Sequence, residues 1–193
     1  MKSKMTAYTL LVLACLWLAG CASAPVLGMA DTTGFDARGA TVRVDYVLDG
    51  GEAATAAERE ELRNERMEEL DRLLREQGFQ PVASGPAEYR IVVTEGARED
   101  VANEWQDAAG TTAVLFTLGL VPAVFEYRKN FHYELWAGQQ RIHAFDTPAT
   151  WQEALGLVSI SSTLSGTRAA RQKARLGAHG SVLALWIEQG SFE

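Results

Sequence analysis

Apolar and polar residues alternate along the first regular segment of the chain, from Thr41 to Leu48. A period of two is typical of a β-strand with one buried face. The next segment, residues 53–77, is rich in Glu, Arg, Leu and Ala. Its larger apolar residues share one broad stripe of a helical wheel, namely Leu62, Met67, Leu70, Leu73 and Leu74. The pattern therefore predicts a strand and then a long amphipathic helix, which Gly78 is suited to end.

Three more strands are expected after this helix. The segment around Ile91 alternates in the same way and predicts a second strand, on which Tyr89, Ile91 and Val93 share a face. Residues 127–136 and 141–145 alternate on either side of Ala137-Gly138-Gln139, which predicts a hairpin.

A second long helix is expected at the end of the chain, over residues 167–189. Gly177 and Gly180 permit a kink in it, and its buried stripe consists of Val182, Leu183, Trp186 and Ile187. We expect an α+β fold, a two-layer sandwich of two main helices on a mostly antiparallel four-stranded sheet. The order is strand, helix, strand, apolar insertion, strand, strand, helix.

The apolar insertion, residues 112–125, contains an uncharged run of 13 residues from Ala113 to Phe125. As a helix this run would be about 20 Å long, which is too short for a hydrocarbon core of roughly 30 Å. The sequence leaves two alternatives for this run. Either it packs in the core against the uncharged segment that follows Glu153, or it forms a surface that contacts lipid or a protein partner. The candidate contact residues are Val114, Leu115, Phe116, Leu118, Leu120, Val121 and Phe125.

The N-terminus has the pattern of an export signal. Lys2 and Lys4 precede an apolar run from Met5 to Leu18, which is too short to span a bilayer, and Leu18-Ala19-Gly20-Cys21 follows. These four residues match the lipobox, and the chain resembles the precursors of bacterial lipoproteins. The resemblance implies that residues 1–20 are removed and that Cys21 is acylated. Ala22 after the cysteine implies the outer membrane, facing the periplasm, with the inner membrane as the alternative.

The expected organisation of the chain follows from this resemblance. Residues 21–39 form a lipidated tether, and residues 40–193 form a single α/β domain that carries the insertion. The segments Leu74–Phe79 and Ala87–Val93 also resemble the N-terminal unit of several small envelope lipoproteins, which concerns the fold and transfers no functional residue.

Charge and cysteine content exclude several kinds of function. The formal charge is −7, and it becomes −9 without Lys2 and Lys4, which argues against nucleic acid as a partner. Without residues 1–20, Cys21 is the one cysteine that remains. We therefore expect no disulfide, thiolate nucleophile or cysteine metal site.

Two groups of polar residues are candidates for chemistry. His132 and Glu134 lie two apart on an expected strand, and pairing in the hairpin would bring His143 near them as a metal or acid–base site. Alternatively, they belong to the polar outer face of the sheet. A basic cluster either meets lipid phosphates or forms a solvated helix face; it consists of Arg168, Arg171, Lys173 and Arg175.

The expected function is that of a non-catalytic envelope lipoprotein that contacts lipid or an envelope protein partner. The sequence indicates no cofactor and no bound metal, and no catalytic motif is recognised. One alternative is an assembly or accessory factor for an outer-membrane or transport complex, using a sheet edge or the apolar residues. The other is a periplasmic metal-dependent enzyme that uses His132, Glu134 and His143.

Overall fold

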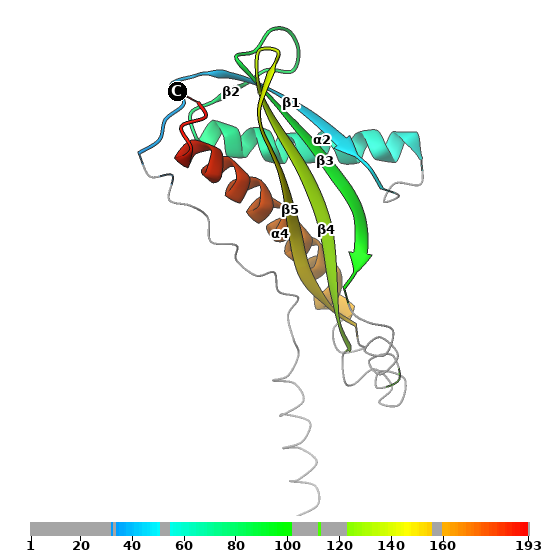
Figure 1. Cartoon of the computed structure of the whole chain (residues 1–193). Helices are drawn as coiled ribbons and strands as arrows, with labels where there is room; N and C mark the ends of the chain where they lie inside the picture. Colours follow the sequence, from blue (N-terminus) through cyan, green and yellow to red (C-terminus); the bar gives the residue numbers. More distant parts are fainter. Residues whose placement is uncertain are drawn as a thin grey trace, which may run out of the picture. The chain divides into compact units, whose positions relative to one another are not determined.

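The computed structural model describes residue 32 and the ranges 34–50, 55–101, 112, 123–155 and 160–192. The signal segment, Cys21 and residues 113–122 lie outside these ranges. In chain order the elements are β1 (Thr41–Leu48), α2 (Ala56–Glu76), β2 (Gln80–Pro81), β3 (Tyr89–Asp100), β4 (Ala123–Ala137), β5 (Gln140–Leu155) and α4 (Ile160–Glu188) (Figure 1).

The chain divides into two compact units. The first unit consists of residues 1–24, 100–127 and 150–172, and the second of residues 25–99, 128–149 and 173–193. The strands β4 and β5 and the helix α4 contribute residues to both units. The buried polar groups described below belong mostly to the second unit.

The five strands form one mixed sheet in the order β2-β1-β3-β4-β5. β1 is parallel to β2 and to β3, with Val42 opposite Tyr89 and Leu48 opposite Glu95. β3 and β4 run antiparallel, because the Gly138 N–H donates to the Glu88 carbonyl and the Val101 N–H donates to the Glu126 carbonyl.

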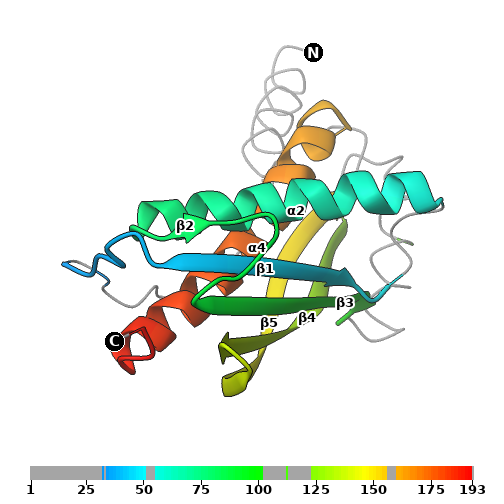
Figure 2. The same ribbon diagram turned by 90° about the horizontal axis from the view of Figure 1, so that it is seen from above.

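The α+β class and the two helices are confirmed, but the expectation of a mostly antiparallel four-stranded sheet was wrong. The helix α2 joins β1 to β3 as a crossover that brings the chain back in the same direction, so these two strands pair in parallel. Figure 2 shows α2 running alongside β1. The additional strand β2 is only two residues long.

Local signals explain where α2 begins and ends. Thr55 and Glu58 form a capping box, in which each side chain accepts a hydrogen bond of 3.1 Å from the other residue's backbone N–H. At the other end Gly78 has a φ of 81°, and its N–H donates to the Arg75 carbonyl while the Phe79 N–H donates to the Leu74 carbonyl. This is the Schellman arrangement that favours glycine after a helix.

Two later elements are longer than expected. β5 continues to Leu155 instead of ending at Phe145, although it contains Pro148. A proline is tolerated here because β5 is the outermost strand in the order of the described sheet. α4 begins at Ile160 and is one continuous helix through Gly177 and Gly180.

In the second unit, both helices cover the same face of the sheet. The ring of Tyr133 on β4 lies 6.4 Å from that of Trp186 on α4, and Arg66 on α2 lies 3.5 Å from Glu95 on β3. The strand residues of this core are Val42, Val44, Tyr46, Ile91, Val93, Phe131, Tyr133 and Leu135, and the helix residues include Leu70, Leu74, Ala178, Val182 and Leu183. Neither of the two described helices combines the length and apolarity that crossing a membrane requires.

Candidate functional site

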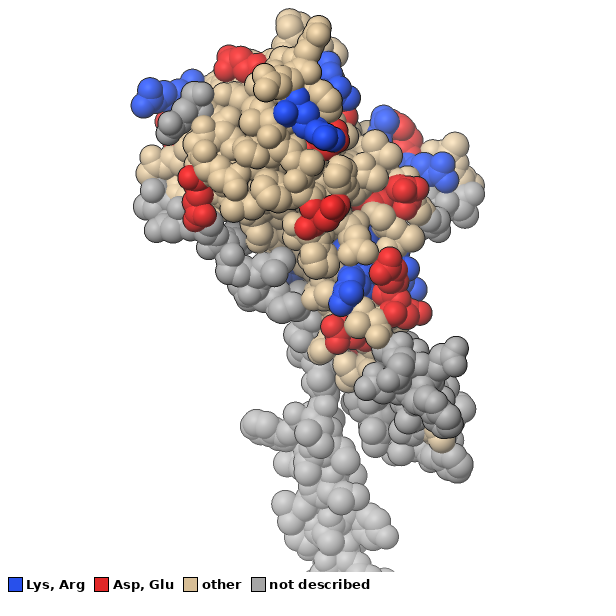
Figure 3. Space-filling model, viewed as in Figure 1, with Lys and Arg blue, Asp and Glu red and all other residues tan. Residues whose placement is uncertain are grey.

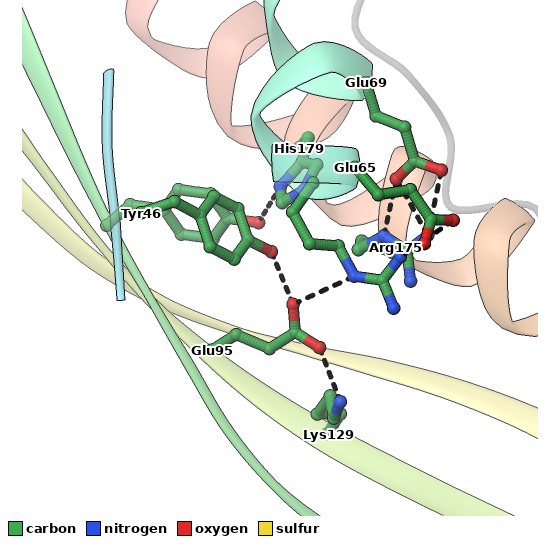
Figure 4. A network of polar contacts seen from close by, with 9 residues as sticks. Tyr46, Glu65, Glu69, Glu95, Lys129, Arg175 and His179 are labelled. Carbon is green, nitrogen blue, oxygen red and sulfur yellow. Dashed lines mark hydrogen bonds and ion pairs between the residues drawn. The ribbon is translucent and has the colours of Figure 1, made fainter. Parts of the chain in front are cut away.

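A buried carboxylate, Glu95, lies at the centre of a network of polar contacts in the second unit (Figure 4). Its Oε2 accepts a hydrogen bond of 2.6 Å from the Tyr46 hydroxyl, and its Oε1 accepts one of 2.5 Å from the Lys129 ammonium. The Arg66 guanidinium lies 3.5 Å away on the remaining side. Four neighbouring elements, β1, β3, β4 and α2, thus meet at one side chain that is 1% exposed.

The pKa of Glu95 follows from these contacts. Burial alone would raise the pKa, but the charge and hydrogen bond of Lys129, the hydrogen bond from Tyr46 and the charge of Arg66 together lower it below its ordinary value. Burial and the Glu95 charge raise the pKa of Tyr46 well above its ordinary value. At neutral pH, therefore, Glu95 is ionised, and Tyr46 keeps its proton and donates a hydrogen bond to Glu95.

A second buried ion pair joins the two helices. Arg175 on α4 donates from Nε to one oxygen of Glu69 at 2.8 Å and from a terminal nitrogen to the other at 3.0 Å. Both side chains are buried, and this two-pronged geometry is the strongest that a guanidinium and a carboxylate can form. The pair holds α2 and α4 at a fixed separation over the sheet.

A tyrosine–histidine pair completes the network. The Tyr133 hydroxyl lies 2.6 Å from Nδ1 of His179, and both side chains are buried. Burial, followed by the charges of Arg175 and Arg66, lowers the pKa of His179 to about 3. The ring is therefore neutral, and its Nε2 has no hydrogen-bond partner among the described residues.

The buried charges of this network are paired. The buried carboxylates Glu69 and Glu95 and the exposed Glu65 face three buried cations, Arg66, Lys129 and Arg175. Such pairs fix which elements pack together, because removing one member of a buried pair leaves an uncompensated charge. Glu95 and Lys129 also line a small recess, together with Leu48, Gly50, Arg59, Leu62 and Gly96.

The predicted lipidation and contact residues lie mostly outside the described part of the chain. This applies to Cys21 and to the contact candidates in the range 114–121. Phe125 is described, and its side chain is half-buried on β4. The predicted tether is described from residue 34 to residue 39, where it lies against the second unit, as detailed below.

The structure brings His132 near Glu134 but not near His143. Nδ1 of His132 lies 2.8 Å from Asp146, while Nε2 on the opposite side of the ring lies 3.7 Å from Glu134. His143 stacks on Phe145, and these odd-numbered residues of β5 point away from the face that carries Asp146. Within the described ranges, no group of three or more His, Cys, Asp or Glu side chains is arranged to hold a metal ion.

The glutamate of this outer cluster is also engaged elsewhere. Glu134 accepts a hydrogen bond of 2.8 Å from Arg141 and one of 3.0 Å from Trp136. The bond from Arg141 is the main reason why the pKa of Glu134 lies below its ordinary value. Positive and negative side chains also lie next to each other on the face of the molecule shown in Figure 3.

The basic cluster on α4 does not form one solvated face. Arg175 is buried against Glu69, so the expectation that it meets lipid phosphates or solvent was wrong. Arg171 donates to Glu153 at 2.7 Å in the first unit. Arg168 and Lys173 are exposed.

Reasoning from the sequence missed the buried network, although one signal was available. Glu95 continues the period of two set by Ile91 and Val93, which places a carboxylate on the apolar face of a strand. Lys129 holds the corresponding position before Phe131 and Tyr133. A charge at such a position indicates a buried partner.

The fold resembles that of a solved structure, protein XCC0632 from Xanthomonas campestris, described under the family model DUF330. The two are 8% identical, the match covers 86% of this chain and 95% of that one, and the TM-score is 0.51. Rare lipoprotein B from Shewanella oneidensis is 9% identical over 77% of this chain and 96% of that one, with a TM-score of 0.46. A minor lipoprotein from Acinetobacter baumannii is 11% identical over 78% of this chain and 92% of that one, with a TM-score of 0.43.

The similarity to the Xanthomonas protein is therefore one of fold, and the other two matches lie below a TM-score of 0.5. No family model matches the sequence. No curated protein sequence matches it either.

Proposed function

We propose that this protein is a bacterial envelope lipoprotein, held at a membrane by acyl chains on Cys21 and acting by non-catalytic contact. The observation that carries the proposal is the order of Lys2 and Lys4, a short apolar run and Leu18-Ala19-Gly20-Cys21. The outer membrane, facing the periplasm, is the proposed location because Ala22 follows the cysteine. The apolar insertion is the proposed contact surface, for lipid or for an envelope protein.

The buried network supports a binding role for the folded part. Its carboxylates and cations pair with one another across β3, β4, α2 and α4, so their charges are used to hold the scaffold. Glu134 and His132 on the outer face are engaged in the same way with Arg141 and Asp146. In this account, the scaffold presents a contact surface while the lipid supplies the membrane affinity.

The experiment compares wild-type protein with a Cys21→Ala variant exported by an ordinary signal. We expect wild-type protein in the membrane fraction and the variant in the soluble fraction, because one acyl-bearing residue supplies the stable anchor. A Cys21→Ala variant that stays in the membrane fraction after a salt wash would contradict the anchor.

The contact surface is tested in the same soluble background. The Cys21→Ala protein should retain weak binding to phosphatidylethanolamine and phosphatidylglycerol vesicles or to a protein in solubilised envelope. Changing Leu115, Phe116 and Leu118 to Ser should abolish that binding. The matched control changes two exposed apolar residues elsewhere, Val47 and Ile142, to Ser. Equal binding by the insertion variant and the control would rule out the contact surface.

A second candidate function, an assembly or accessory factor, is favoured by one observation. β5 is the outermost strand of the described sheet and runs for 16 residues. The free edge of such a strand can pair with an extended segment of another protein. Crosslinking from exposed positions of β5, such as Ala144, in intact cells would then capture an envelope protein. Recovery of the uncrosslinked lipoprotein alone would count against this role.

A further inference from the structure

The segment that enters β1 is bound to the second unit and is not a free tether. The Ala37 N–H donates to the Gln77 carbonyl at 3.0 Å, and the Gly39 N–H donates to the Gly78 carbonyl at 2.9 Å. These two carbonyls directly follow the last turn of α2. The segment 35–40, called the strap below, thus uses backbone acceptors that the end of the helix leaves available.

Aromatic side chains hold the strap from the other side. The ring of Phe35 lies 5.9 Å from that of Phe79 and 6.2 Å from that of Phe192, and Phe79 and Phe192 are 4.8 Å apart. Phe192 also meets Tyr89 at 5.1 Å. In Figure 1 the marked C-terminus lies beside the segment that leads into β1. The two ends of the folded chain therefore share one aromatic cluster.

The sequence is adapted to this docking at two positions. Gly78 has a φ of 81°, and a Cβ there would collide with the Asp36 carboxylate and lie 3.1 Å from the Ala37 nitrogen. The Asp36 carboxylate in turn accepts a hydrogen bond of 2.9 Å from the Arg38 N–H, and Arg38 has a φ of 54°. A non-glycine residue adopts a positive φ only where its surroundings stabilise it.

We infer that the strap fixes where the lipid-bearing arm leaves the fold, so that the end of the second unit formed by the C-terminus of α2 and Phe192 faces the membrane. This inference rests on the lipid anchor proposed above. Of the expected tether, residues 35–39 belong to the strap, and residues 22–34 separate Cys21 from it. The partner of this end of the unit is a lipid surface.

The strap orients the second unit because the length of the arm can be compared with the length of α2. Residues 22–34 are 13 residues and reach at most about 45 Å when fully extended. The 21 residues of α2 span about 30 Å. The docked end of α2 therefore stays within the reach of residues 22–34, while the end at Thr55 can lie about 30 Å farther from the bilayer.

The orientation is tested with the lipidated full-length protein in vesicles that carry a headgroup energy acceptor. A donor dye is attached at Glu76→Cys or at Ala56→Cys, two exposed positions at opposite ends of α2. Acylation consumes the Cys21 thiol, so each variant has one reactive thiol. We expect stronger transfer from position 76 than from position 56, and loss of this difference when Phe35→Ala releases the strap. Val47→Ser, on the exposed side of β1, should leave the difference intact. Equal transfer from both positions would overturn the orientation.

The strap itself is tested without lipid, by amide hydrogen exchange in the soluble Cys21→Ala protein. The Ala37 and Gly39 amides should be protected and should lose that protection in Phe35→Ala. Exchange at the rate of an unfolded chain in the Cys21→Ala protein would overturn the strap. Protected amides in this protein, together with wild-type protein from membranes that carries no acyl group on Cys21, would instead contradict the proposed anchor and the orientation, while leaving the docking in place.

Discussion

At the scale of single residues, Glu95 compensates two cations at once. Its carboxylate accepts from Lys129 and lies next to Arg66, while the Tyr46 hydroxyl occupies the remaining position. Removing the carboxylate takes away the buried counter-charge that Lys129 and Arg66 share, and leaves Arg66 beside the exposed Glu65. Removing Lys129 leaves Glu95 with Arg66 and Tyr46. Loss of the Glu95 carboxylate should therefore destabilise the fold more than loss of the Lys129 ammonium.

We expect Glu95→Gln to lower the free energy of unfolding by about 3–5 kcal/mol, the range found when one partner of a buried ion pair is removed. Lys129→Met should lower the free energy of unfolding by less. Glu99→Gln, an exposed change on the same strand as Glu95, should change it by no more than about 0.5 kcal/mol. Unfolding in denaturant measures all three. A Glu95→Gln protein as stable as Glu99→Gln would show that the network does not hold the fold together.

The buried side chain of His179 makes the stability of the fold depend on pH. Its pKa is about 3 in the folded protein, because the ring is buried between Tyr133 and Tyr46 and faces Arg66 and Arg175. In the unfolded chain an imidazole has a pKa of about 6.5. Below that value the unfolded state binds a proton that the folded state does not, so stability falls as the pH drops from about 6.5 towards 3.

The slope from this one group approaches about 1.4 kcal/mol per pH unit at its steepest. The lowered pKa of Glu95 acts in the same direction, but only below its ordinary value of 4.5. Unfolding measured between pH 7 and pH 5 therefore isolates the histidine. We expect His179→Gln to flatten the dependence in this range and the half-buried control His143→Gln to preserve it. An unchanged slope in His179→Gln would refute the assignment.

At the scale of elements, periodicity predicted β1, α2 and the hairpin, because each has one apolar face and a clear end signal. α2 begins at Ala56, three residues later than expected, where Thr55 caps it. β2 could not be predicted from periodicity, since two residues carry no period. Pro148 hid the second half of β5, since proline signals a strand end except at an edge.

The candidate site was less predictable than the fold. The Glu69–Arg175 pair joins residues 106 positions apart, and neither residue carries a local sign of its partner. Both lie on helices that contain many charged residues, and a helical wheel assigns such charged residues to the solvent-exposed face. Tertiary packing decides which of these charges are buried. The parallel pairing of β1 and β3, in contrast, was implied by the predicted strand–helix–strand order.

At the scale of the whole molecule, the proposed arrangement consists of a lipid anchor at Cys21, a short arm, the docked strap and a scaffold that buried ion pairs hold together. The strap connects the anchor and the arm to the scaffold, because the arm ends where the strap docks at the C-terminus of α2. The buried charges hold together those parts of α2, α4 and the sheet that belong to the second unit, so a force on the arm acts on this unit as one body. The proposed function and the orientation depend on what Cys21 carries.

The most direct measurement is the mass of the N-terminal peptide of the protein purified from membranes. We expect a chain that begins at Cys21, with a diacylglyceryl group on its sulfur and an acyl group on its amino nitrogen. The matched sample is the Cys21→Ala protein, which should lack both groups. A mature chain that begins at another residue, or an unmodified Cys21, would contradict the central claim.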